Sequence, residues 1–78
     1  MTNLEIYKNA FIESFSVEED KLSDLEYRLI ADWDSIGHMS LIAKLEDDFD
    51  IMMDTDDIID FSSFEKGKEI MGKYNVVF

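Results

Sequence analysis

The first apolar pattern in the chain has the period of an amphipathic helix, with side chains three or four residues apart sharing one face. Thr2 stands where a helix N-cap belongs, and Glu5 follows at the spacing of a capping box, in which the two residues satisfy each other's free backbone N–H groups. We therefore predict a helix from about residue 3 to residue 15. Its apolar stripe consists of Leu4, Tyr7, Ala10, Phe11 and Phe15.

A second amphipathic pattern begins at Asp34 or Ser35 and ends near Asp48. Either residue is a good N-cap because its side-chain oxygen can accept a hydrogen bond from a free backbone N–H. The charge of Asp34 also suits the positive end of a helix dipole. We therefore predict a second helix here. Its apolar positions are Ile36, Met39, Leu41, Ile42, Leu45 and Phe49, and the inner stripe is Leu41, Leu45 and Phe49.

The last helix is predicted to begin at Ser62, because Ser62 and Glu65 again have the spacing of a capping box. Gly67 lies inside this helix, where glycine costs about 1 kcal/mol relative to alanine. We therefore interpret Gly67 as a point of close approach to another element. The expected inner face consists of Phe64, Gly67, Ile70 or Met71, and Tyr74.

Two less regular segments connect these helices. Residues 16–34 lack a clear period, and we expect apolar side chains to hold them on the core. Residues 50–61 have room for one short helix, capped by Asp54 or Thr55, and at least one of three successive apolar residues should be buried there. The apolar side chains in question are Leu22, Leu25, Leu29 and Ile30 in the first segment, and Ile51, Met52 and Met53 in the second.

The composition supports one all-α domain spanning residues 1–78. Proline is absent and glycine is scarce, which favours helices over turn-rich β structure. The absence of cysteine excludes disulfides and zinc–thiolate sites. The N-terminus shows no basic region followed by an apolar run, and no apolar stretch approaches the length of a membrane span. We therefore expect a cytoplasmic location.

The charge is strongly one-sided, with 19 acidic and seven basic side chains and a formal net charge of −12. Such a surface disfavours nucleic acids and anionic membranes as partners, and favours proteins with basic patches. The acidic side chains are densest between Lys44 and Lys66, where no basic residue occurs. They are Glu46, Asp47, Asp48, Asp50, Asp54, Asp56, Asp57, Asp60 and Glu65.

A catalytic role for Ser35 is not indicated. His38 is the only histidine and lies three residues after Ser35, so the two side chains could meet on one helix face. A Ser–His pair also needs a group that orients the base and an oxyanion site, and so small a helical domain offers little cleft. We predict that Ser35 is no nucleophile and that His38 faces solvent. A single histidine also excludes two-histidine metal motifs.

The segment from Asp54 to Glu65 resembles part of an EF-hand calcium loop, because oxygen-bearing side chains fall at positions 1, 3, 7, 9 and 12 of it. Position 6 is Ile59, where the loop needs glycine for a sharp turn, and position 5 is Ile58, where a ligand belongs. We therefore predict no EF-hand here, and expect only loose binding of divalent cations to the acidic segment.

A set of residues from the second helix onward shares the order and spacing of a known signature: Asp34-Ser35-Ile36, Leu41, Leu45-Glu46-Asp47-Asp48-Phe49, Met53 and Phe61-Ser62-Ser63-Phe64. The set resembles the acyl carrier protein family, in which Asp-Ser-Leu opens the second helix and an apolar-Thr-Thr-Val run leads into the last one. The resemblance extends over about residues 3–74.

The resemblance implies an all-α four-helix bundle, with three main helices, a short third helix and a long loop between the first two. It implies a carrier rather than an enzyme. Ser35 would bear 4′-phosphopantetheine, attached as a phosphodiester from coenzyme A by a phosphopantetheinyl transferase. The thiol of that arm would hold acyl groups as thioesters and present them to partner enzymes, which would suit a chain without cysteine.

The resemblance also implies how partners are recognised. In the family, the aspartate before the serine takes part in recognition by the transferase, and the acidic second helix docks on basic patches of partner enzymes. We expect a monomer without nucleic-acid binding or membrane insertion. The implied recognition residues are Asp34, Ile36, Met39, Glu46, Asp47 and Asp57.

Five positions depart from the pattern of fatty-acid carriers. Ile36 replaces leucine, Gly37 and Ser40 stand where acidic residues are common, Lys44 adds a positive charge, and Trp33 replaces a small residue. These departures favour a specialised fatty-acid, polyketide or related biosynthetic pathway. Two alternatives stay open: an aminoacyl or peptidyl carrier, and an acidic calcium-binding or regulatory helical protein without a covalent cofactor.

Overall fold

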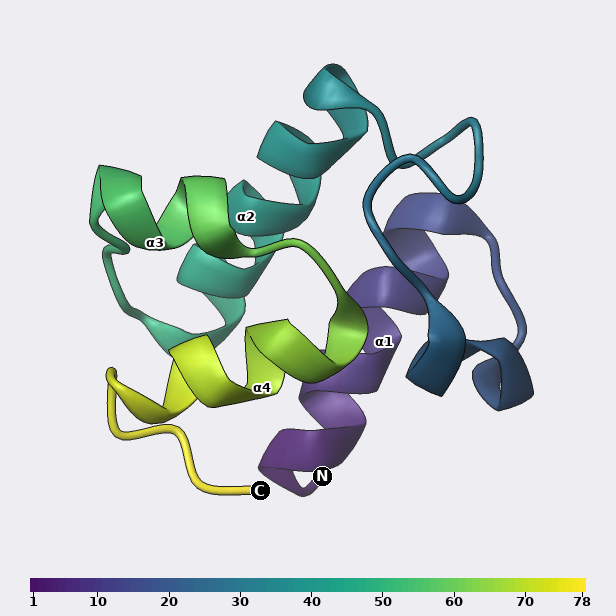
Figure 1. Ribbon diagram of the computed structural model, residues 1–78. Coiled ribbons are helices and arrows are strands. Elements are labelled where there is room, and N and C mark those ends of the chain that lie inside the picture. Colours follow the sequence, from purple (N-terminus) through teal and green to yellow (C-terminus); the bar gives the residue numbers. More distant parts are fainter.

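The computed structural model describes the whole chain, Met1–Phe78, and contains helices and no strands. The α-helices are α1 (Asn3–Phe15), α2 (Ser35–Phe49), α3 (Thr55–Asp60) and α4 (Phe64–Gly72), and a 3₁₀-helix, η1, spans Glu19–Asp24 (Figure 1). The all-α prediction is therefore confirmed. None of the helices combines the length and the apolar character that a membrane-crossing segment requires.

The helices pack around one apolar core. α1 lies against α2, and η1 contacts both α1 and α4. Figure 1 shows the two chain termini close together beside the start of α1. The C-terminal tail is docked there: the side-chain amide of Asn3 donates to the carbonyl of Val77 at 3.1 Å, and the rings of Tyr7 and Phe78 lie 5.0 Å apart.

The helix starts follow from their caps. Thr2 and Glu5 form the predicted capping box, and Asp34 caps α2 by accepting a hydrogen bond from the backbone N–H of Gly37 at 2.9 Å. The predicted cap of the last helix is wrong by one residue, because Ser63 rather than Ser62 accepts from the backbone of Lys66.

Aromatic rings dominate the core, and Trp33 is fully buried among them. Its ring stacks on Phe15 at 5.3 Å and meets Phe11 edge-on at 5.6 Å. The pattern of apolar positions did not predict that Trp33 is in the core, because Trp33 lies outside the three predicted helices. Burying this ring ties the segment before α2 to α1.

The segment between α1 and α2 is held by side chains and by backbone hydrogen bonds. Leu22 and Leu25 are buried as predicted, whereas Leu29 is 60% exposed and does not hold the segment. The carbonyl of Leu25 accepts from the N–H of Phe64, and the N–H of Tyr27 donates to the carbonyl of Ser62. These contacts fasten the segment to the start of α4.

Gly67 is a close-approach point, as predicted. A Cβ atom there would overlap the hydroxyl of Tyr7 and the ring of Phe61, so α4 can pack this closely on these two side chains only with glycine at this position. Met53 is the buried member of the apolar triplet that follows α2, and Met52 is exposed.

Candidate functional site

Ser35 is the first residue of α2, and its side chain is exposed. Asp34 fixes the turn in two ways: its carboxylate caps the N–H of Gly37, and its carbonyl accepts from the N–H of His38 at 2.7 Å. The hydroxyl of Ser35 therefore sits on the end of a 15-residue helix whose first turn is well ordered by hydrogen bonds.

Tyr27 lies directly beside Ser35, with 3.1 Å between the two hydroxyl oxygens. The phenol ring is held edge-on against Trp33 and His38. The guanidinium carbon of Arg28 lies 5.5 Å from the centre of the same ring. The hydrogen bond with Ser35, and secondly the proximity of Arg28, lower the pKa of the Tyr27 hydroxyl below its ordinary value. Sequence reasoning missed both residues, because neither belongs to a periodic segment.

His38 does not face solvent, which corrects the prediction. Its Nδ1 accepts a hydrogen bond from the indole N–H of Trp33 at 2.9 Å, and its Nε2 lies 2.8 Å from the carbonyl oxygen of Ile58. An indole N–H can only donate, so Nδ1 must accept and Nε2 must carry the proton. Both ring nitrogens are thus occupied, and His38 has no free nitrogen to serve as a base for Ser35.

Gly37 makes room for the segment that precedes α2. A Cβ atom at this position would overlap the backbone carbonyl of Asp32 and approach the ring of Phe15 to 3.3 Å. Glycine therefore lets the first turn of α2 pack directly on the backbone that carries Trp33. This packing explains why glycine follows the Asp34-Ser35 pair so closely.

A groove of about 340 Å³ opens next to Ser35, between α2 and α3. Its lining is largely apolar, with hydroxyl groups at Tyr27, Ser35 and Ser62; the remaining lining residues are His38, Met39, Ile58, Ile59 and Phe61. Two of the apolar lining side chains stay largely in solvent, Ile59 at 72% and Met39 at 53% exposure, and Ile36, next to Ser35 in the sequence, is 80% exposed. Helix α2 thus presents apolar side chains to solvent on the side that bears Ser35.

The other expected recognition residues have different surroundings. Asp47 is exposed and forms no ion pair, whereas the carboxylate of Glu46 is half-buried and accepts from the N–H of Met53 at 2.9 Å. Both residues were expected to recognise partners, but only Asp47 has an unengaged carboxylate.

Asp57 is buried, contrary to its expected place on a docking surface. Its carboxylate accepts hydrogen bonds from the hydroxyl of Tyr74 and from the ammonium of Lys73, at 2.5 and 2.9 Å. These two bonds lower the pKa of the Asp57 carboxyl below its ordinary value. The Tyr74 hydroxyl also accepts from the backbone N–H of Asp54, so the cluster joins α3 to the end of α4. Asp57 therefore has a structural role, and neither oxygen of its carboxylate is free to bind a partner protein.

The acidic segment forms no calcium loop. The part that resembles an EF-hand is occupied by α3, which runs from Thr55 to Asp60 as a regular helix. No three acidic or histidine side chains converge in a way that could hold a metal ion.

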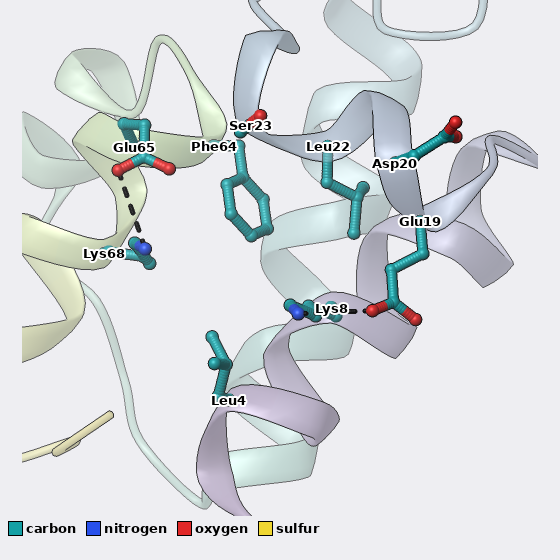
Figure 2. A pocket seen from close by; sticks show the side chains of 9 residues that line it. All are labelled: Leu4, Lys8, Glu19, Asp20, Leu22, Ser23, Phe64, Glu65 and Lys68. Atoms are coloured by element: carbon teal, nitrogen blue, oxygen red, sulfur yellow. Dashed lines mark hydrogen bonds and ion pairs between the residues drawn. The ribbon is translucent and has the colours of Figure 1, made fainter.

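A second hollow, of about 500 Å³, lies between α1, η1 and α4 and shares no lining residue with the groove at Ser35. Figure 2 shows the ring of Phe64 and the side chain of Leu22 in it. Its two lysines are already paired, Lys8 with Glu19 at 3.3 Å and Lys68 with Glu65 at 3.5 Å. These pairs leave no free cation for an anionic ligand.

Comparison with known proteins found no match for this chain among family models, curated proteins or solved structures.

Proposed function

We propose that the protein is an acyl carrier, with Ser35 as the attachment point of 4′-phosphopantetheine. The observation that carries this proposal is the exposed Ser35 hydroxyl at the start of α2, beside an apolar groove of about 340 Å³. A serine in this place is open to a modifying enzyme, and the only histidine of the chain does not activate it, because both nitrogens of His38 are hydrogen-bonded elsewhere.

The site fits the group in size and chemistry. The groove lies within the range of small-molecule sites, about 300–1,000 Å³. Tyr27 and Ser62 contribute hydroxyl groups to the lining of the groove, and Met39 and Ile59 form part of its apolar wall. When attached, the arm would supply the thiol that this cysteine-free chain lacks and would hold the acyl group on it. The role of the chain would be to anchor the arm and to display it.

The finer architecture proposed is a four-helix bundle, made of α1, α2, the short α3 and α4, with a long loop between α1 and α2. The loop includes η1 and ends in the buried Trp33. In this arrangement α2 and α3 flank the attachment point, which places Ser35 at one end of the bundle.

The surface around Ser35 suits docking to partner enzymes. Exposed apolar side chains, Ile36 and Met39, follow the acidic Asp34 on the first turns of α2, and the exposed Asp47 lies near the other end of the same helix. We propose that the transferase and the acyl-handling enzymes meet this surface with apolar contacts surrounded by basic side chains, which gives fast, salt-sensitive association. The half-buried Glu46 and the buried Asp57 contribute less, because both carboxylates are engaged within the chain.

An aminoacyl or peptidyl carrier would use the same attachment point and differs only in its cargo. A calcium-binding protein without a covalent cofactor is less well supported, because α3 occupies the segment that a calcium loop would need. A regulatory helical protein without a covalent cofactor stays the remaining alternative.

The test is a mass measurement on the intact protein. The folded chain is incubated with coenzyme A, magnesium and a broad-specificity phosphopantetheinyl transferase. We expect the mass of one phosphopantetheine to be added, and to be absent from Ser35→Ala. Ser40→Ala, which changes another exposed serine of the same helix, serves as the control and should be modified normally. A folded wild-type protein that takes up no adduct would overturn the proposal.

A further inference from the structure

Esterification of Ser35 would add a negative charge at an already acidic place. The carboxylate of Asp34 adjoins Ser35 and occupies the helix end by capping Gly37, in a chain of net charge −12. A phosphodiester there would experience repulsion from Asp34 unless donors or a cation face it from another element. The segment that precedes α2 supplies one such donor, at Tyr27, and a cation next to that donor, at Arg28.

The first group is the hydroxyl of Tyr27, 3.1 Å from the hydroxyl of Ser35. Its position is fixed on both sides: the N–H of Tyr27 donates to the carbonyl of Ser62 at 2.8 Å, and the ring packs edge-on against His38 with 5.4 Å between ring centres. A hydroxyl held in this way loses little freedom when it binds a neighbouring oxygen.

The second group is the guanidinium of Arg28, the only arginine of the chain. Arg28 adopts a left-handed backbone, with φ 68°, and its N–H donates to the carbonyl of Trp33 at 2.9 Å. Five of the six lysines form ion pairs, whereas Arg28 and Lys21 form none. An unpaired guanidinium is unusual among 19 acidic side chains, and this one lies over the Tyr27 ring.

We infer that Tyr27 is a positioning residue that orients the Ser35 hydroxyl for modification, and that Tyr27 and Arg28 together hold the phosphate once it is attached. The inference rests on the proposed function. In the transfer, Ser35 Oγ forms a bond to the phosphorus next to pantetheine, the pyrophosphate bond of coenzyme A breaks, and adenosine 3′,5′-bisphosphate leaves. The serine proton passes to a base of the transferase, because the Tyr27 hydroxyl is already hydrogen-bonded to the Ser35 oxygen.

The first measurement is the rate of transfer from coenzyme A. Tyr27→Phe keeps the ring and removes only the hydroxyl, and the loss of one hydrogen bond should lower kcat about two- to tenfold with little change in KM. Tyr74→Phe removes a hydroxyl from the α3–α4 cluster instead, and should leave transfer unchanged at a temperature where both variants are folded. The transfer rate of Arg28→Gln is compared with that of Lys21→Gln. Lys21 is the other cation without an ion pair, so its variant is the control for the loss of one positive charge.

The second measurement uses the isolated modified protein, so that contacts with the transferase play no part. A phosphate anion bonded to the Tyr27 hydroxyl disfavours the phenolate. We expect the Tyr27 ring, followed by NMR during a pH titration, to ionise at higher pH after modification than before. Arg28→Gln should increase that difference, since it removes the cation that offsets the phosphate charge, whereas Lys21→Gln should not.

The outcomes separate the two proposals. Slower modification of Tyr27→Phe, with a Tyr27 titration that moves on modification and moves further in Arg28→Gln, supports the inference. A shift that Arg28→Gln leaves unchanged overturns it, because esterification also removes the Ser35 proton whose hydrogen bond lowers the Tyr27 pKa, and that loss alone raises the pKa. Equal rates for Tyr27→Phe and wild type, or a Tyr27 titration that is the same in both forms, overturn it while the attachment at Ser35 stands. Absence of any adduct on the folded wild-type protein overturns the proposed function itself.

Discussion

The indole N–H of Trp33 donates a hydrogen bond to Nδ1 of His38, with 2.9 Å between the nitrogens. The opposite nitrogen of the same imidazole lies 2.8 Å from the carbonyl oxygen of Ile58. A short chain of hydrogen bonds therefore runs from the segment before α2, through α2, to α3. It passes beside the groove at Ser35, so the geometry of the candidate site depends on it.

Replacing His38 by phenylalanine tests this chain of bonds. The aromatic ring is kept, but the indole N–H of the buried Trp33 and the carbonyl of the half-buried Ile58 lose their partner. A buried group left unpaired costs about 1–3 kcal/mol, and a part-exposed carbonyl costs less. The core of so small a domain typically supplies about 3–5 kcal/mol. We therefore expect His38→Phe to be severely destabilised in urea unfolding followed by the fluorescence of the single tryptophan.

The control is Met39→Leu, a change at the next residue of α2 whose side chain is 53% exposed. It should alter the free energy of unfolding by less than about 0.5 kcal/mol. A His38→Phe protein as stable as Met39→Leu would show that the two hydrogen bonds contribute nothing to stability.

Two glycines of α4 should respond in opposite ways to alanine. Intrinsic helix propensity favours alanine over glycine by about 1 kcal/mol. At Gly72 nothing lies within 4 Å of the added Cβ, so Gly72→Ala should be neutral or stabilising. At Gly67 the Cβ meets Tyr7 and Phe61, and overpacking of this kind costs about 1–3 kcal/mol or more. Chemical denaturation of both variants checks the difference; a more stable Gly67→Ala would contradict the tight packing of Gly67 on Tyr7 and Phe61.

The helices could be predicted because the residues that determine them, the apolar stripe and the N-cap, lie close together in the sequence. The apolar stripe of α1 and the capping box at Thr2 involve residues within one or two turns of each other. The same holds for α2, whose cap, Asp34, adjoins its first turn. Ser35 could be singled out for that reason, since the start of an amphipathic helix can be recognised from neighbouring residues alone. The one-residue error at Ser62 shows that two adjacent serines cannot be told apart in this way.

The surroundings of Ser35 depend on contacts between distant segments. Tyr27 reaches the site because its backbone bonds to Ser62, 35 positions later in the sequence. His38 turns inward because Trp33 and Ile58 offer it a donor and an acceptor. No period or spacing within one helix encodes such pairings. The remaining signal was in the composition: the only tryptophan of the chain precedes the Asp-Ser pair, and one of its three glycines, Gly37, stands two positions after Ser35.

The buried carboxylate of Asp57 gives a pH-dependent contribution to stability. The density of acidic residues in the sequence predicted that Asp57 lies on an acidic surface. In the structure Asp57 is buried, and the hydrogen bonds from Tyr74 and Lys73 hold the pKa of its carboxyl below the ordinary value. A carboxyl with a lowered pKa in the folded state stabilises the protein above its unfolded pKa, and the contribution is lost as the pH falls through the folded pKa. The same pair raises the pKa of Lys73, so at the alkaline end the contribution of the pair is lost only as the pH rises through the folded pKa of Lys73.

Asp57→Asn should therefore melt at a lower temperature than wild type at pH 7, and the gap should narrow as the pH falls below about 4. This pH-dependent contribution to stability requires a carboxylate that is hydrogen-bonded within the protein. Asp47 is exposed and has no such bond, so it provides the matched control. Asp47→Asn removes one negative charge from a repulsive surface and should melt at the wild-type temperature or slightly above it. Thermal melts of the three proteins between pH 7 and pH 3 make the comparison. A gap between wild type and Asp57→Asn that stays constant over this range would mean that the bonds from Tyr74 and Lys73 do not favour the ionised carboxylate.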